Sequence, residues 1–392
     1  MEEIYLDNSA TTKPFASVCQ IMMETMETAY GNPSSMHKKG IKAEHYVHHA
    51  SDQIAKTLKV SPKEIFYTSG GTESNNMALI GTALANKRMG SHIITTEIEH
   101  PSVHNPLLFL KEQGFELTFL PVDSFGHIKK EDLLNAIRED TILISIMYVN
   151  NEIGTLEPVA ELAKAAKEKK PDIFVHSDAI QAYGKYQIYP KREGIDLLSI
   201  SGHKIHGPKG IGALYISDKV KIKPILYGGG QQKGMRSGTE NVSGIAGLGM
   251  AAEEIYQNYK EKIQELYEKK SYFIEQIVKI EGTTVNGVEL EKGIQKVEET
   301  APHIISVSFG GIKSEVLLHA LEEKGIYVSS GSACASNHPK LSSTLKAIGV
   351  KRELMDATLR FSMSGDTTKQ ELDIVLETLK NLLPQLRRFV RN

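Results

Sequence analysis

The feature that most constrains the fold of this chain is an alternation of strand-like and helix-like segments from about residue 15 to about residue 260. Apolar runs such as 92–96, 116–120 and 141–149 are typical of strands, and stretches with helical spacing, such as 131–138 and 159–170, separate them. Regular alternation of this kind predicts an α/β fold with a mostly parallel sheet covered by helices. Ligands of such sheets bind at the carboxyl ends of the strands.

The second part of the chain predicts a smaller α+β unit. A helical stretch over about 241–280 follows a glycine-rich loop at 227–238 and links the two parts. The expected elements after it are strands over 303–309, 326–329 and 358–363 and helices over 314–324 and 368–390. We therefore expect a large domain (15–260) and a small domain (1–14 with 261–392) that carries a loop at about 329–342.

Composition narrows the range of functions. The net charge of −2 over 392 residues gives no basic surface for nucleic acid. The N-terminus lacks the basic and apolar regions of a signal peptide, and the apolar run at 142–149 is too short to cross a bilayer. Two cysteines imply no disulfide framework. We expect a cytoplasmic protein with no direct nucleic-acid or membrane partner.

The stretch from Ser201 to Gly210 carries the first candidate residue, Lys204. Apolar runs at 195–200 and 211–216 flank it, so a strand, a tight polar loop and a second strand are predicted. A lysine at a strand end among small residues can approach a cofactor closely and lose part of its solvation, which lowers its pKa. The alternative is an ordinary solvated lysine, and the motif alone does not decide between them.

The stretch from Ser69 to Asn75 (SGGTESN) lies between a predicted strand and a predicted helix over 72–89. Glycines and a hydroxyl at a helix N-terminus can bind an anion, because free backbone N–H groups and the helix dipole point toward it. The glycine spacing fits neither a dinucleotide motif nor a P-loop, so one phosphate group is the expected ligand. A plain N-cap by Thr72 is an equal alternative.

Further polar side chains follow other predicted strands. The carboxylate of Asp178 can keep a ring nitrogen of a cofactor protonated. Gln181, three residues later, can form a hydrogen bond with a ring hydroxyl. His100 can stack on a planar cofactor or move protons, and Asn151 lies at the same expected edge of the sheet. The alternatives are an N-capping aspartate and a capping or packed histidine.

Cys334 lies in the sequence SSGSACAS, among small residues and before a polar run. A structural cysteine prefers apolar neighbours, so this pattern favours a reactive thiol on an exposed loop over an inert one. Cys19 lies in a helix-like run with methionines and is expected to pack. No metal site is expected.

Together, a strand-end lysine, a strand-end aspartate, a stacking histidine and a glycine-rich phosphate site describe a pyridoxal phosphate site. The chain resembles the cysteine desulfurases of the NifS/IscS type, within the class V aminotransferase group of fold-type I enzymes. The matching motifs run in the family's order over nearly the whole chain: LDNSATT (6–12), GNPS (31–34), SGGTES (69–74), VNNEIG (149–154), SGHK (201–204), GMRSGT (234–239) and SSGSAC (329–334).

The resemblance implies a role for each candidate residue in binding pyridoxal 5'-phosphate. Lys204 would bond covalently to the cofactor and later carry a proton, Asp178 would pair with the ring nitrogen, Gln181 would bond the ring hydroxyl, and His100 would stack on the ring. Residues assigned to the phosphate are Gly71, Thr72, Ser201 and His203, with Thr239 reaching the cofactor of the second subunit of a homodimer.

The resemblance also implies the reaction. Asn151 would lie near the ring and the substrate, Arg360 would bind the carboxylate of L-cysteine, and Cys334 would take the sulfur as a persulfide while L-alanine leaves. An acceptor protein, either an iron–sulfur scaffold or a tRNA-thiolation enzyme, would then receive the sulfur, and Cys334 would contact an iron–sulfur cluster during transfer. Residues 361–366 depart from the pattern of many relatives, so the resemblance does not predict the details of the substrate pocket.

Other functions remain as alternatives. The nearest is a selenocysteine lyase with the same cofactor. An aminotransferase would have no need of Cys334, and a cysteine hydrolase would leave the Lys204 motif unexplained. A catalytically idle scaffold of a sulfur pathway conflicts with the presence of Lys204, Asp178, His100 and Cys334.

Overall fold

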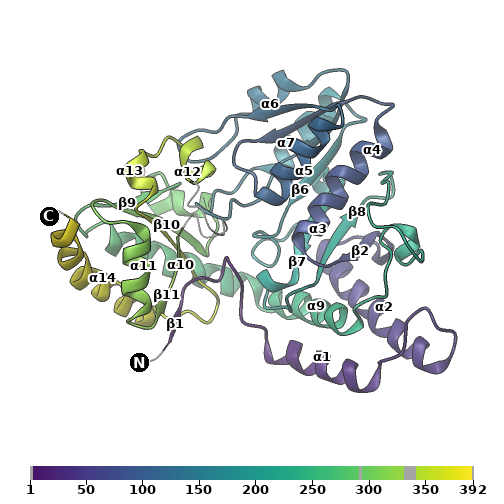
Figure 1. Cartoon of the computed structure of the whole chain (residues 1–392), viewed down its shortest axis with the longest axis horizontal. Helices are drawn as coiled ribbons and strands as arrows, with labels where there is room; N and C mark the ends of the chain where they lie inside the picture. The colour runs from purple at the N-terminus through teal and green to yellow at the C-terminus, as the bar shows by residue number, and fades with distance from the viewer. Residues whose placement is uncertain (1–2, 291–293, 331–340, 391–392) are drawn as a thin grey trace.

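A computed structural model of the protein describes residues 3–290, 294–330 and 341–390. The chain forms two lobes (Figure 1), one around a seven-stranded sheet and one around a four-stranded sheet. The two ends of the described chain both belong to the lobe with the smaller sheet (Figure 1).

The large sheet confirms the predicted α/β fold. Its strands, in spatial order, are β2 (Ile65–Thr68), β8 (Gly212–Ile216), β7 (Leu197–Ser201), β6 (Phe174–Asp178), β5 (Thr141–Ser145), β3 (His92–Thr96) and β4 (Glu116–Leu120). Strand β8 runs antiparallel to both of its neighbours, and the remaining pairs are parallel. The carboxyl ends of β3, β5, β6 and β7 therefore point to the same edge of the sheet.

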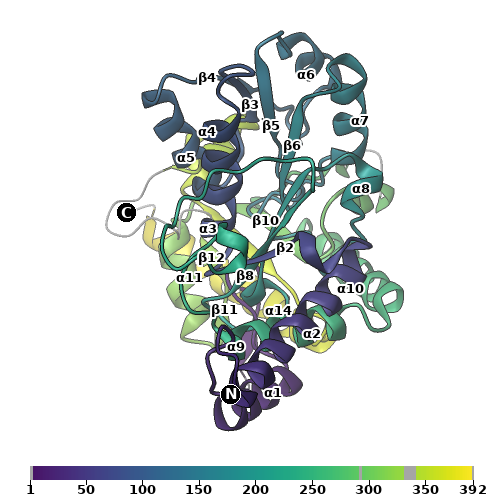
Figure 2. The same ribbon diagram turned by 90° about the vertical axis from the view of Figure 1, so that its right-hand side faces the viewer.

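Both faces of this sheet are buried, because successive residues of a strand point to opposite sides. Ile93 and Leu197 pack in the core on one face, and the next residues, Ile94 and Leu198, pack in the core on the other. Helices α3 (Gly71–Asn76), η2 (Met77–Gly81), α4 (Thr82–Asn86) and α5 (Pro101–Glu112) cover the first face. The opposite face packs against α2 (Lys38–Leu58), α7 (Val159–Lys169) and α9 (Val242–Ile255). Figure 2 shows α1 (Ala16–Thr28) beside α2 and α9 at the lower end of the molecule.

The small lobe has its own apolar core. Its antiparallel sheet has the order β12 (Ser329–Ser330), β13 (Thr358–Ser362), β10 (Ile304–Phe309) and β9 (Thr283–Asn286). Helices α10 (Tyr259–Ile277), α11 (Ser314–Glu322) and α14 (Lys369–Val390) contribute Phe273, Leu317 and Leu379 to the core. The N-terminal strand β1 (Ile4–Tyr5) pairs in parallel with β11 (Ile326–Tyr327) and anchors the start of the chain here.

Two elements that the sequence predicts as continuous are each divided in the structure. The helix expected over 241–280 is two helices, because Asn258 adopts a left-handed backbone conformation (φ 50°) between α9 and α10. Asparagine tolerates this conformation better than most residues. The strand expected over 326–329 is also divided, because β11 pairs with β1 and β12 pairs with β13.

Four further short α-helices lie in the described part of the chain: α6 (Lys130–Ala136), α8 (Pro190–Glu193), α12 (Ser343–Ala347) and α13 (Arg352–Met355). Within the described residues, no helix is both long enough and apolar enough to cross a membrane.

Candidate active site

Lys204 lies in a short 3₁₀ turn, Gly202–Lys204, directly after strand β7. Its Nζ atom donates hydrogen bonds to the backbone carbonyl oxygens of Ser9 (2.6 Å) and Ala10 (2.8 Å). The residue is half-buried, and its amine is held by the N-terminal segment that crosses from the small lobe. The structure thus places Lys204 at a strand end as predicted, and not as a freely solvated side chain.

Asp178 is the last residue of β6, the strand next to β7, and only 5% of it is exposed. Its Oδ1 atom accepts a hydrogen bond from the Ile180 backbone N–H (3.0 Å), and its Oδ2 atom accepts one from Asn75 Nδ2 (2.8 Å). Both oxygens therefore act as acceptors, which is the role of an ionised carboxylate.

His100 is the N-cap of α5, and it follows strand β3. Its Nδ1 atom accepts a hydrogen bond from the Ser102 N–H (3.1 Å) and lies 2.7 Å from Ser102 Oγ. Burial lowers the pKa of the imidazole, the charge of Asp178 raises it, and the charge of Lys204 lowers it. The capping alternative is thus realised, and the same side chain also lies within electrostatic range of Asp178 and Lys204.

The start of α3 has the features expected of a phosphate site. Gly70 is its N-cap, so Thr72 is not the cap residue, and no side chain caps this helix. A Cβ atom on Gly71 would lie 2.1 Å from Cδ1 of Ile180 and 3.6 Å from Cβ of Ser201, so only glycine allows this close approach. The Ser201 hydroxyl is buried and has no hydrogen-bond partner among the described residues. A phosphate oxygen bound there would give this hydroxyl a partner.

Gln181 and His203 both contact the N-terminal segment that holds Lys204. Gln181 Nε2 donates to the Ser9 carbonyl oxygen (2.9 Å), the same oxygen that accepts from Lys204. His203 Nδ1 lies 3.3 Å from Thr11 Oγ1, and burial, with the charges of Lys204 and Lys209, lowers the pKa of His203 to about 4. His203 is therefore a neutral imidazole at physiological pH.

Arg360 comes from β13 of the small sheet and is buried. Its Nη1 atom donates to the backbone carbonyl oxygen of Asn151 (2.8 Å), and its Nη2 atom forms an ion pair with Asp7 (2.9 Å). The buried Nε atom has no partner within the described part of the chain. The guanidinium thus links the two lobes and has a buried N–H group that no described residue accepts.

Two further predicted residues are Thr239 and Cys334. Thr239 is exposed, and the loop that precedes it is tied to α3 by an ion pair between Arg236 and Glu73 (2.7 Å). Cys334 lies outside the described residues. Cys19, expected to pack, is exposed on α1, so that prediction is wrong.

Sequence reasoning missed several buried polar residues of the site. Asn75 and Ser102 connect Asp178 to His100 through hydrogen bonds. Asn75 lies in the stretch 69–75, whose pattern indicates a phosphate site, and Ser102 lies two residues after His100. Glu99, next to His100, is buried. Burial raises its pKa to about 8, although the hydrogen bond from the Met147 N–H lowers it. No pattern in the sequence distinguishes these from ordinary polar residues.

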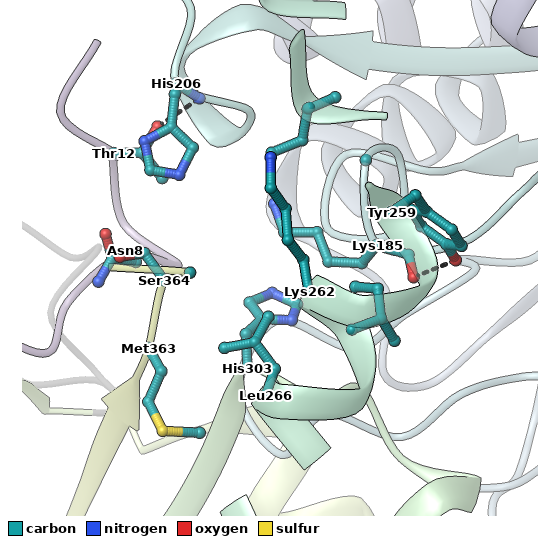
Figure 3. Close-up of a pocket in the computed structure, with 14 residues that line it drawn as sticks. Asn8, Thr12, Lys185, His206, Tyr259, Lys262, Leu266, His303, Met363 and Ser364 are labelled. Carbon is teal, nitrogen blue, oxygen red and sulfur yellow. Dashed lines mark hydrogen bonds between the residues drawn. The ribbon is translucent and has the colours of Figure 1, made fainter. Parts of the chain in front are cut away.

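Lys185 is a further buried residue that the sequence did not reveal. Its Nζ atom donates to the backbone carbonyl oxygen of Lys204 (2.6 Å), and burial, reinforced by the charge of Lys204, lowers the pKa of Lys185 to about 7. The side chain lines a cavity of about 40 Å³ between the lobes (Figure 3), where the Tyr259 hydroxyl bonds the Lys185 carbonyl oxygen. The hydrogen bond from Lys185 thus holds the backbone of the turn that carries Lys204.

The sequence and the fold of this chain are similar to those of known proteins. The sequence profile of class-V aminotransferases matches residues 4–375, and the chain belongs to that family. Enzymes of the family depend on pyridoxal phosphate.

Individual proteins and solved structures are also similar to this chain. The protein named cysteine desulfurase IscS from Dictyoglomus turgidum is 43% identical over 386 residues, which cover 98% of this chain and 95% of that protein. A solved structure described as a NifS-like protein is 36% identical with a TM-score of 0.91, over 98% of this chain and 100% of that one. A structure described as SspA in complex with cysteine is 33% identical with a TM-score of 0.80, over 93% and 100% of the two chains.

Proposed function

We propose that this protein is a pyridoxal phosphate-dependent cysteine desulfurase. L-cysteine is converted to L-alanine, its C–S bond breaks, and the sulfur forms a new S–S bond with Cys334, so that the enzyme thiol becomes a persulfide. The observation that carries this proposal is the convergence of Lys204, Asp178 and His100 from three strand ends at one edge of the large sheet. Relatives named cysteine desulfurase over almost the full length of the chain support the same activity.

The residues present fit the cofactor. The unpartnered Ser201 hydroxyl and the close approach at Gly71 suit a phosphate group, and the acceptor oxygens of Asp178 suit a protonated ring nitrogen. When bound, pyridoxal phosphate supplies an electron sink that stabilises negative charge at the α-carbon of the substrate. We assign the covalent attachment to Lys204, whose amine already lies beside Ser9 and Ala10.

Further residues of this chain orient the substrate and move protons. Arg360 presents a donor to the carboxylate of L-cysteine, since charge-assisted hydrogen bonds to a planar carboxylate are the strongest that arginine makes. The Lys204 amine would carry a proton to and from the substrate carbon, and the neutral His100 ring would lie against the bound cofactor. Thiolate attack by Cys334 on the substrate sulfur then completes the transfer.

We also assign an acceptor protein and a homodimer to this function. The acceptor is an iron–sulfur scaffold or a tRNA-thiolation enzyme, and the second subunit contributes Thr239 to the neighbouring site. The exposed position of Thr239 is compatible with that contact.

The test compares the two cysteines of the chain. Purified protein loaded with pyridoxal phosphate is incubated with L-cysteine and a thiol reductant, and alanine and sulfide are measured. The unchanged protein and Cys19→Ser should each form alanine and sulfide in equal amounts. Cys334→Ser should bind the cofactor but form less than about a hundredth of the sulfide that the unchanged protein forms. Without reductant, mass spectrometry finds one added sulfur atom on the peptide with Cys334. Full turnover by Cys334→Ser would contradict the proposal.

A further inference from the structure

A chain of hydrogen bonds between buried side chains links the two groups expected on either side of the cofactor ring. Asn75 on α3 donates through Nδ2 to Asp178 Oδ2 (2.8 Å) and to Ser102 Oγ (2.9 Å). Ser102 on α5 in turn contacts His100 Nδ1 through both its backbone N–H and its hydroxyl. Asn75 is fully buried and Ser102 nearly so. Three elements, α3, α5 and β6, thus meet in one network.

The directions of these hydrogen bonds follow from which atoms can only donate or only accept. The backbone N–H of Ser102 can only donate, so Nδ1 of His100 is an acceptor and carries no hydrogen. The Ser102 hydroxyl oxygen receives a hydrogen from Asn75, which leaves the hydroxyl hydrogen available for Nδ1. Because an amide nitrogen has two hydrogens, Asn75 uses one for Asp178 and one for Ser102.

The direction of each bond fixes the state of the histidine. We propose that Ser102 and Asn75 are positioning residues that hold His100 as the neutral imidazole with its single proton on Nε2. This nitrogen is the one left available to a ligand, since no hydrogen bond within the described residues engages it. The role in catalysis rests on the proposed function, whereas the protonation pattern is a property of the protein alone.

The surroundings of the ring favour the same state. Burial lowers the pKa of His100, and the charged groups that face it from neighbouring elements, Asp178 on β6 and Lys204 after β7, oppose one another. Two hydrogen bonds to an unprotonated Nδ1 disfavour the imidazolium form further. His100 therefore offers a hydrogen from Nε2 and does not accept the first proton of the reaction.

The same network constrains Asp178. Its two oxygens accept from Asn75 and from the Ile180 N–H, so the carboxylate has a fixed orientation before any cofactor binds. Asn75 thereby couples the orientation of Asp178 to the tautomer of His100. Removal of the Ser102 hydroxyl should disturb the histidine and leave Asp178 in place.

The experiment uses the full-length chain with ¹³C- and ¹⁵N-labelled histidine, first without cofactor and then with pyridoxal phosphate. The His100 signals are assigned by their absence in His100→Gln. In the unchanged protein we expect Nδ1 to have the shift of an unprotonated ring nitrogen and Nε2 that of a protonated one. In Ser102→Ala the backbone N–H still donates to Nδ1, so Nε2 should stay protonated. The Nδ1 shift should nevertheless change, and the pKa of His100 should rise, because the neutral form loses the hydrogen bond from the hydroxyl.

Matched variants separate this role from a general effect of losing a buried hydroxyl. Ser308 also accepts from an asparagine amide (Asn286, 2.9 Å) and bonds a second side chain (Thr358, 2.7 Å), but it lies in the small sheet. Ser308→Ala should leave the His100 signals unchanged. Ser102→Thr keeps the hydroxyl and should restore them, and Asn75→Ala should shift them in the same direction as Ser102→Ala.

Kinetics with L-cysteine give a second measurement. Loss of one hydrogen bond to the histidine predicts a fall in kcat of about fivefold to tenfold in Ser102→Ala, with KM changed by less than about twofold and recovery in Ser102→Thr. A protonated Nδ1 in the unchanged protein, or identical His100 signals in Ser102→Ala and the unchanged protein, would overturn the inference. An unchanged protein that shows the expected histidine but no activity on L-cysteine would instead count against the proposed function alone.

Discussion

The two lobes contribute to the candidate site in different ways. On the side of the large sheet, Lys204, Asp178 and His100 each have hydrogen-bond partners from the chain itself. On the side of the small sheet, Arg360 is paired with Asp7, but its buried Nε atom has no partner among the described residues. Lys204, Asp178 and His100 are thus ordered before any ligand binds. The Arg360 Nε atom, like the Ser201 hydroxyl on the large side, is instead buried without a partner among the described residues.

This difference follows from the two kinds of sheet. Parallel strands end at a common edge, so the residues that follow β3, β6 and β7 meet there and are fixed by helices α3 and α5. Arg360 instead lies within an antiparallel strand and reaches across to Asn151 and Asp7. We therefore expect changes on the large side to reduce kcat and changes on the small side to raise KM.

The largest effect is expected for Asp178→Asn. Both oxygens of Asp178 accept from N–H groups, so either orientation of an asparagine amide would place its NH₂ group against a donor. We expect kcat to fall about a hundredfold or more, because the ring nitrogen also loses its ionic partner.

A control for Asp178→Asn comes from the same sheet. Asp196 is also buried and accepts from Lys167 and from the Val175 N–H, but it lies at the opposite end of β7. Asp196→Asn should lower the free energy of unfolding without changing kcat. If Asp178→Asn and Asp196→Asn had equal kcat values, Asp178 would have no special role in catalysis.

A smaller effect, and one on KM, is expected for Arg360→Lys. Lysine keeps the charge but cannot contact Asp7, the Asn151 carbonyl oxygen and a substrate carboxylate together. Loss of a charge-assisted hydrogen bond predicts a KM for L-cysteine about tenfold to a hundredfold higher, with kcat less affected. Steady-state kinetics measure both constants, and a fall in kcat with KM unchanged would contradict the division between the lobes.

The smallest effect is expected for Glu99→Gln. Burial raises the pKa of Glu99 to about 8, and its Oε1 atom accepts from Met147 (2.8 Å) and Thr96 (3.1 Å), while Oε2 is buried without a partner in the described part of the chain. The carboxyl is therefore protonated at neutral pH, and glutamine copies its shape and charge. Activity at pH 7 should stay within about twofold of the unchanged protein.

The pH dependence of Glu99→Gln checks the sign of that shift. A folded-state pKa above the unfolded value of 4.5 gives stability that is present below pH 4.5 and lost as pH rises through about 8. The free energy of unfolding, measured by urea titration, should therefore fall over this range more steeply for the unchanged protein than for Glu99→Gln. Parallel curves would show that Glu99 is ionised throughout.

Much of this account was accessible from the sequence. Lys204, Asp178 and His100 lie at or after strand ends, as the sequence predicts, because apolar strands are recognisable and their carboxyl ends share one edge. Arg360 came from resemblance to a family, because nothing in its local sequence separates it from a surface arginine.

The remaining features depend on contacts between distant segments. Asn75 meets Ser102 and Asp178 only because α3, α5 and β6 pack together, and Lys185 is recognisable only by its burial. The break at Asn258 was missed because polar and apolar residues keep a helical spacing on both sides of it. Hydrogen bonds between elements are not encoded in local patterns.

The most direct test of the account is to identify the lysine that holds the cofactor. The chain, loaded with pyridoxal phosphate, is treated with borohydride to make the covalent bond permanent, digested, and analysed by mass spectrometry. We expect the modification on Lys204, and we expect it to stay there in Lys185→Met. Modification of Lys185 or of another lysine in the unchanged protein, or of none, would contradict this expectation.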